Sequence, residues 1–245
     1  PDPGILNIPE DVMSVSDFTK GMVLVTGPAG SGKSTTMACI VDRINHSREG
    51  HIITLEDPLE YLHRHDKCIV SQREICTDTE SYLVALRATL RQSPDVILLG
   101  EMRDYETIQT AMTAAETGHL ILSSLHTTGA ANTIGRIADV FEPAQQRQIS
   151  TQLSMVLQAV ISQQLIPDIN GHTIPAFEVM RLNPAIRNMI RDNKVHQIDG
   201  VIASSAHEHM RSMDQSLLEL YKQNKITKET ALKFASNADM LKRKL

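Results

Sequence analysis

The chain has 245 residues, 41% hydrophobic and 22% charged, a composition ordinary for a globular protein with a sizeable buried core. Its net charge of −5 argues against a broad nucleic-acid-binding surface, and no apolar run approaches the roughly 18 residues of a membrane span. The three cysteines, Cys39, Cys68 and Cys76, show no C-x-x-C spacing. They indicate reduced thiols in a cytoplasmic protein and disfavour a zinc site or a disulfide framework.

The chain is expected to begin as a loop. Pro1, Pro3, Gly4 and Pro9 disfavour regular structure, and an apolar run follows soon afterwards. We therefore expect a loop-like start and a folded core that begins near residue 15.

Residues 15–142 alternate between short apolar runs and amphipathic stretches, which is typical of a mostly parallel sheet covered by helices. The expected strands are Met22–Thr26, Ile52–Leu55, Cys68–Ser71, Val96–Leu99 and Leu120–Leu125. The expected helices are Lys33–Asn45, Thr79–Gln92 and Asp104–Thr117. The last of these has Asp104 as a start signal and Gly118 as a stop signal.

Beyond residue 142 the pattern is mainly helical. Ala144–Gln164 has apolar residues at helical spacing and is expected to be one long helix. Gln163–Ile166 and Thr173–Val179, joined around Asn170-Gly171, are expected to form a β-hairpin. The remaining expected helices are Pro184–Arg191, Val195–Ala203, Met213–Gln223 and Thr227–Ala238. We therefore expect residues 143–245 to form a hairpin and a mainly helical C-terminal subdomain.

The segment Gly27-Pro28-Ala29-Gly30-Ser31-Gly32-Lys33-Ser34 follows the first expected strand and matches the phosphate-binding loop pattern. Glycines let several backbone N–H groups point at one phosphate, Lys33 adds positive charge, and the Ser34 hydroxyl is placed to bind Mg²⁺. The helix that follows directs its N-terminal dipole at the same phosphates. This pattern predicts that the chain binds a nucleoside triphosphate. The expected binding residues are Gly30, Ser31, Gly32, Lys33, Ser34 and Thr35.

Hydrolysis also needs a carboxylate near the metal and a group that acts on water. Glu101 follows the strand Val96–Leu99 and Gly100, and it is the carboxylate best placed to reach Mg²⁺. A second acidic cluster, Glu56-Asp57-Pro58-Leu59-Glu60, follows Ile52–Leu55 and is expected at the same edge of the sheet. The residues themselves do not choose between Glu56 and Glu60 as the group that acts on water.

Two histidines and several arginines are further candidates. His119 and His126 flank the expected strand Leu120–Leu125 and are candidates for sensing the phosphate, although their spacing puts them on opposite faces of an ideal strand. The arginines that could neutralise charge in the transition state are Arg87, Arg91, Arg103 and Arg136.

Together these motifs resemble those of the hexameric ATPases of type IV pili and of type II and IV secretion. The similarity is greatest to the pilus-retraction, or twitching-motility (PilT-like), branch. Four motifs of that family occur in order: the phosphate-binding loop, Thr54–Glu60, Leu99–Asp104 and Gly118–Thr128. The resemblance implies an α/β fold with a RecA-like P-loop NTPase core over residues 15–142, and ATP as the nucleotide.

The resemblance also implies roles for individual residues. Glu60 would be the general base and Glu101 the second-motif carboxylate, with Ser34 and Glu101 binding Mg²⁺. His119 and His126 would sense the nucleotide state, and Arg136 would lie near the nucleotide.

Pro184–Arg191 resembles a helix characteristic of retraction ATPases, whereas the residues alone predict only a helix with Asn183 as N-cap and Pro184 in the first turn. The four-cysteine zinc insert usual in the extension and secretion branch is not present. Both features favour retraction.

The resemblance implies a homo-oligomer, a hexameric ring in the full-length form. It would act on a pilus platform protein at the inner face of the cytoplasmic membrane and touch the membrane only through such partners. Family members carry a PAS-like domain before the ATPase core, so residues 1–14 are expected to be the remnant of a linker from it. A related extension or secretion ATPase and a nucleotide-gated module with little hydrolysis remain alternatives. A nucleic-acid translocase is disfavoured by the acidic charge.

Overall fold

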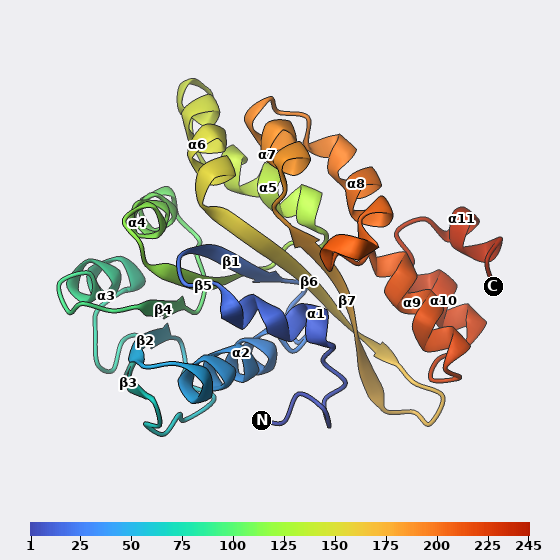
Figure 1. Cartoon of the computed structure of the whole chain (residues 1–245), viewed down its shortest axis with the longest axis horizontal. Coiled ribbons are helices and arrows are strands. Elements are labelled where there is room, and N and C mark those ends of the chain that lie inside the picture. Colours follow the sequence, from blue (N-terminus) through green and yellow to red (C-terminus); the bar gives the residue numbers. More distant parts are fainter.

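A seven-stranded sheet lies at the centre of the computed structural model, which describes residues 1–245 (Figure 1). Its strand order is β3-β2-β4-β5-β1-β6-β7. The strands are β1 (Gly21–Thr26), β2 (Gly50–Glu56), β3 (Cys68–Glu74), β4 (Val96–Leu99), β5 (Leu120–Leu125), β6 (Leu157–Pro167) and β7 (Thr173–Arg181). All neighbours pair in parallel except β6 and β7, which are antiparallel. The expected mostly parallel α/β fold is therefore confirmed.

Helices cover both faces of the sheet. They are α1 (Glu10–Met13), α2 (Lys33–Ser47), α3 (Tyr82–Thr89), α4 (Tyr105–Glu116), α5 (Ala130–Asp139), α6 (Pro143–Val156), α7 (Pro184–Arg191), α8 (Ile198–Ser204), α9 (Met213–Lys222), α10 (Lys228–Phe234) and α11 (Ala238–Lys242). Short 3₁₀ turns occupy Ser14–Asp17, Val195–Gln197 and Ala206–Glu208. No helix has the length and apolar character needed to cross a bilayer.

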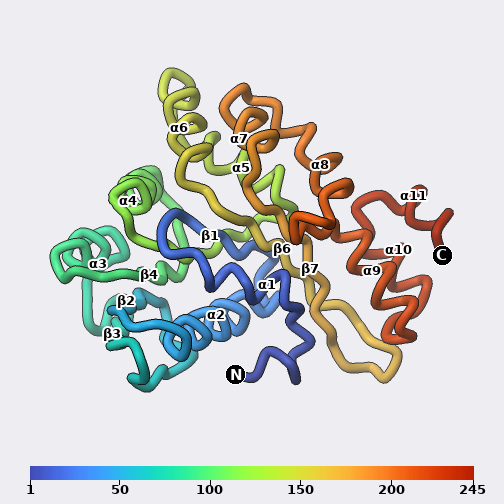
Figure 2. Tube along the Cα trace, viewed as in Figure 1, coloured from blue at the N-terminus to red at the C-terminus, as the bar shows by residue number.

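Alternate side chains of β1 enter two separate hydrophobic clusters, as expected for a strand covered on both faces. Met22 and Leu24 pack with residues of α3 to α8, whereas Val23 and Val25 pack with α1 and α2. A third, smaller cluster joins the far end of the β6–β7 hairpin to α9, α10 and α11. These last helices lie beyond β7, at the edge of the sheet opposite β3 (Figure 2).

The expected long helix Ala144–Gln164 is wrong in its second half. The helix ends at Val156, and Leu157–Pro167 forms β6, which pairs in parallel with β1. Leu157, Ala159, Val160 and Ile161 are all fully buried. A strand that is buried on both faces has a nearly continuous apolar sequence, and such a sequence is equally compatible with a buried helix. Only the pairing with β1 identifies this segment as a strand.

The expected hairpin is confirmed and is longer than predicted, since β6 and β7 pair from Ala159 opposite Arg181 to Pro167 opposite Thr173. Its strands belong to the same sheet as the core, so the sheet continues past residue 142. Within the first 14 residues, Val12 and Met13 are buried in the cluster around α2. The division into a linker, a core and a C-terminal subdomain stays a prediction.

Other boundaries differ by a few residues. The expected helix Thr79–Gln92 is confined to Tyr82–Thr89, with the Ser81 side chain accepting from the Val84 N–H. The expected helix Thr227–Ala238 is broken after Phe234, where the Asp214 carboxylate accepts from the N–H groups of Ser236 and Asn237. These side chains replace helical backbone hydrogen bonds and thereby end or start a helix.

Candidate nucleotide-binding site

The loop between β1 and α2 is curled around the side chain of Lys33. The Lys33 Nζ donates to the carbonyl oxygens of Gly27 and Pro28, both at 2.9 Å, and the residue is buried. Burial lowers the pKa of Lys33, and the negative charge of Glu101 opposes that shift. Gly27, Gly30 and Gly32 all have positive φ, which permits the curl. The expected phosphate-binding loop is therefore formed.

Gln163 of β6 packs closely against this loop. A Cβ on Gly27 would lie 2.2 Å from the Gln163 carbonyl oxygen, and one on Gly32 would lie 2.8 Å from its Nε2. The Gln163 Oε1 accepts from the Thr36 hydroxyl at 2.6 Å. Two of the loop glycines are thus required by a close approach as well as by backbone conformation. The sequence did not indicate this role for Gln163, since its partner Thr36 lies 127 positions away and the first part of β6 is compatible with the expected helix Ala144–Gln164.

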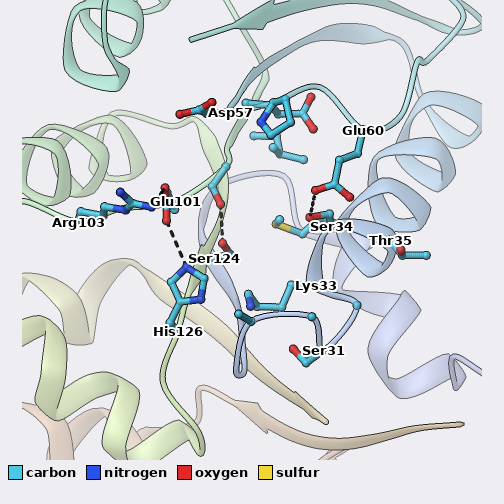
Figure 3. Close-up of a pocket in the computed structure, with 18 of the residues that line it drawn as sticks. Ser31, Lys33, Ser34, Thr35, Asp57, Glu60, Glu101, Arg103, Ser124 and His126 are labelled. Carbon is cyan, nitrogen blue, oxygen red and sulfur yellow. Dashed lines mark hydrogen bonds and ion pairs between the residues drawn. The ribbon is translucent and has the colours of Figure 1, made fainter. Parts of the chain in front are cut away.

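A pocket of 430 Å³ opens above the loop at the carboxyl edge of the sheet (Figure 3). This is the edge at which ligands of parallel α/β sheets bind. Side chains from four parts of the fold converge on it: Lys33 and Ser34 from the start of α2, Glu56 at the end of β2 with Asp57 and Glu60 after it, Glu101 after β4, and His126 after β5. The carboxylates predicted from two separate motifs therefore share one pocket with the phosphate-binding loop.

Glu60 and Glu56 have different surroundings. The Ser34 hydroxyl donates to the Glu60 Oε1 at 3.0 Å, and Glu60 is exposed to the pocket. The Glu56 Oε2 accepts from the Thr54 hydroxyl at 2.7 Å and lies 3.4 Å from the Gln72 amide nitrogen. Burial raises the pKa of the Glu56 carboxyl. Of the two candidates, only Glu60 contacts a residue of the phosphate-binding loop.

The Glu101 carboxylate contacts a guanidinium group and an imidazole ring inside the pocket. Its Oε1 lies 2.7 Å from an Arg103 guanidinium nitrogen, and its Oε2 lies 3.3 Å from the His126 Nε2. The Glu101 side chain is 14% exposed, whereas that of Arg103 is 76% exposed. Arg103 is the only one of the four candidate arginines that lines this pocket.

The glycine before Glu101 has a steric cause. A Cβ on Gly100 would lie 2.8 Å from the Tyr82 hydroxyl oxygen and 3.2 Å from the Leu55 carbonyl oxygen. The Gly100 N–H donates to that carbonyl, and the Gly100 carbonyl accepts from the Ser124 hydroxyl. Many P-loop enzymes carry aspartate here, but in this chain Tyr82 occupies the space.

The profile of the type II/IV secretion system protein family matches residues 9–243. The chain belongs to this family. It is 46% identical over 237 residues to a twitching motility protein of Neisseria gonorrhoeae, covering 96% of this chain and 63% of that protein. It is 48% identical over 226 residues to the type IV pilus retraction ATPase PilT of Pseudomonas aeruginosa, covering 92% of this chain and 66% of PilT.

Among solved structures, the pilus retraction motor PilT with bound ADP is similar, with a TM-score of 0.93 and 47% identity. The match covers 99% of this chain and 69% of that one. The family resemblance drawn from the motifs is confirmed. This chain spans about two thirds of the length of the curated relatives it matches.

Two of the residues expected at the nucleotide site, His119 and Arg136, do not line the pocket. His119 precedes β5 and so lies at the amino edge of the sheet, where its Nδ1 is 2.9 Å from the Ala114 carbonyl oxygen. A strand of this length separates its two ends by roughly 20 Å, so His119 is remote from His126. Arg136 is an exposed residue of α5 and does not line the pocket.

The donors in the pocket fit a magnesium ion held mainly by nucleotide and water. Ser34, Glu60 and Glu101 supply hydroxyl and carboxylate oxygens to one cavity. No group of three or more His, Cys, Asp or Glu side chains is arranged as an all-protein metal site. Mg²⁺ bound beside phosphates uses only one or two protein oxygens and keeps several waters, so no such cage is needed.

Proposed function

We propose that this chain is the ATP-hydrolysing part of a motor subunit that powers retraction of a type IV pilus. The observation that carries the proposal is the convergence of the phosphate-binding loop with Glu60, Glu101 and His126 in one pocket (Figure 3). The similarity to a pilus retraction ATPase over nearly the whole of this chain supports it.

The loop and the start of α2 would hold the phosphates of ATP. Backbone N–H groups at the N-terminus of α2 and its dipole attract the phosphate charge, and Lys33 adds a fixed ammonium group at the same point. Ser34 and Glu101 would hold Mg²⁺, which neutralises phosphate charge and orients the terminal phosphate for attack.

Glu60 would act as the general base that takes a proton from the attacking water. Its hydrogen bond from Ser34 keeps the carboxylate beside the phosphate-binding loop. An ionised carboxylate next to the terminal phosphate can accept this proton as the oxygen–phosphorus bond forms. His126 and Arg103 contact Glu101 and would respond to charge at the terminal phosphate.

The motor would be a ring of identical subunits, a hexamer, with ATP at each interface. The positions of Arg136 and His119 support a shared site: the family resemblance assigns both to the nucleotide, yet both lie outside the pocket of their own chain. In a ring such residues can face a neighbouring subunit. We further propose a pilus platform protein at the inner face of the cytoplasmic membrane as the partner, with no role for nucleic acid.

The test is genetic complementation in the source organism after deletion of the gene. The wild-type gene and a control Glu49→Gln, an exposed glutamate outside the pocket, should both restore twitching. Glu60→Gln at equal expression should not, and the cells should accumulate surface pili because extension continues without retraction. Loss of all pili on deletion would instead indicate an extension motor. Unchanged twitching on deletion would contradict the proposal.

A further inference from the structure

The segment that carries Glu60 has almost no regular structure of its own. Residues 57–67 join β2 to β3 and contain neither helix nor strand. No backbone-to-backbone hydrogen bond involves residues 57–66. A loop of this kind has many accessible conformations unless other groups satisfy its peptide N–H and carbonyl groups. The position of Glu60 must therefore be set by side chains outside the loop.

Two side chains of β3 supply those bonds on either side of Glu60. The Gln72 Oε1 accepts from the His63 N–H at 2.8 Å, and its Nε2 donates to the Tyr61 carbonyl at 2.8 Å. The Glu74 Oε2 accepts from the Leu59 N–H at 3.0 Å. Residues 72 and 74 share one face of β3 because side chains alternate along a strand.

The half-buried carboxylate of Glu56 orients Gln72. In the β2–β3 register Thr54 lies opposite Gln72, and Glu56 lies opposite Glu74. The Glu56 Oε2 accepts from the Thr54 hydroxyl and lies 3.4 Å from the Gln72 Nε2. This contact directs the amide nitrogen of Gln72 towards acceptors and its oxygen towards the His63 N–H. Glu56 thereby has a role that the proposed hydrolysis does not give it.

The other side of the loop is tied to the phosphate-binding residues. The Tyr61 hydroxyl and the Thr35 hydroxyl lie 2.7 Å apart, one residue beyond the Ser34–Glu60 contact. Gln72 holds the backbone of Tyr61 while Thr35 holds its side chain. Glu60 is thus flanked by fixed residues.

We infer that Gln72, supported by Glu74, is a positioning residue that holds Glu60 at the phosphate-binding loop. The inference rests on the proposed function where it concerns hydrolysis, whereas the hold on the loop stands independently of it. A displacement of about 1 Å in a reacting group can cost on the order of a hundredfold in rate. Loss of Gln72 should therefore affect the chemical step much more than nucleotide binding.

The first test is steady-state ATP hydrolysis by the protein carrying Gln72→Ala. We expect kcat to fall by about 10- to 100-fold while the KM for ATP changes less than about threefold. In a Glu60→Gln background the same substitution should cause no further fall, since the group being positioned is gone. Ser71→Ala is the matched control: Ser71 adjoins Gln72 on β3, and its hydroxyl bonds to the His51 ring at 3.1 Å. It should keep the wild-type kcat.

The second test measures hydrogen exchange of backbone amides and needs no turnover. Gln72→Ala should speed exchange of the His63 amide about tenfold or more, with a thermal midpoint close to that of Ser71→Ala. Gln72→Met keeps the length of the side chain without its hydrogen bonds, so it should behave in the same way and replaces the alanine variant if that one folds poorly. Unchanged exchange at His63, or an unchanged kcat, would overturn the inference. If the wild-type protein does not hydrolyse ATP, the proposed function fails. The exchange experiment still tests whether Gln72 holds the loop that carries Glu60.

Discussion

Replacing Gly100 by alanine tests why this chain has no side chain before Glu101. The new Cβ would lie 2.8 Å from the Tyr82 hydroxyl oxygen and 3.2 Å from the Leu55 carbonyl oxygen, both closer than ordinary contact. Gly100 does not have positive φ, so the cost is steric and not conformational. Overpacking of this kind costs about 1–3 kcal/mol, partly offset by about 0.4–1 kcal/mol from the less flexible unfolded chain. We expect a net loss of about 1–2 kcal/mol in the free energy of unfolding.

A substitution of Tyr82 separates the contact with the Tyr82 hydroxyl from the contact with the Leu55 carbonyl. Tyr82→Phe removes the nearer oxygen from this residue of the pocket lining, and alone should cost less than about 0.5 kcal/mol in the free energy of unfolding. In the Tyr82→Phe background the Gly100→Ala penalty should fall by about 1 kcal/mol, since only the Leu55 contact remains.

The assay is urea unfolding of the wild type, both single variants and the double variant, followed by circular dichroism. Equal m-values would show that the free energies are comparable. Additive effects, with no coupling between positions 82 and 100, would refute the claim that the tyrosine hydroxyl excludes a side chain here.

Three further substitutions test separate parts of the structure. Lys33→Ala should weaken ATP binding by about 10- to 100-fold in titration calorimetry, and unchanged affinity would contradict the role of the ammonium group in the loop. Asn183→Ala should lower unfolding stability by about 1 kcal/mol, since the Asn183 side chain accepts from the Ile186 N–H at 2.9 Å; no loss would argue against a capping role. Burial raises the pKa of the Glu178 carboxyl above its ordinary value, so the folded state releases this proton at a higher pH than the unfolded state does. The free energy of unfolding of the wild type should therefore fall as the pH rises from the unfolded-state pKa of this carboxyl to its folded-state pKa. Glu178→Gln should lack this fall, and parallel pH profiles of unfolding would contradict the assignment.

The parts of the site that follow from local sequence were predictable. The phosphate-binding loop has a fixed residue pattern, and Glu60 and Glu101 each follow an apolar run that ends at one edge of a parallel sheet. His119 is different. It precedes β5 whereas His126 follows it, so the two histidines lie at opposite edges of the sheet whichever face of the strand each one occupies.

What the sequence could not provide are the non-local contacts. The strand Leu157–Pro167 is identified by its pairing with β1, because its apolar spacing is compatible with a helix. Gln163 and Gln72 carry no motif, and their partners lie on other elements of the fold. Glutamine has both a donor and an acceptor and serves many environments, so its type alone does not indicate a bracing role.

The central claim is that this pocket hydrolyses ATP with Glu60 as the base. Phosphate release from Mg²⁺–ATP by the wild-type protein and by Glu60→Gln tests it most directly, with ATP affinity measured on both. The account predicts turnover by the wild type, a rate about 10²- to 10⁴-fold lower in the variant, and affinities within a few-fold of each other, because a glutamine still accepts from the Ser34 hydroxyl. Equal rates for the two proteins would contradict it.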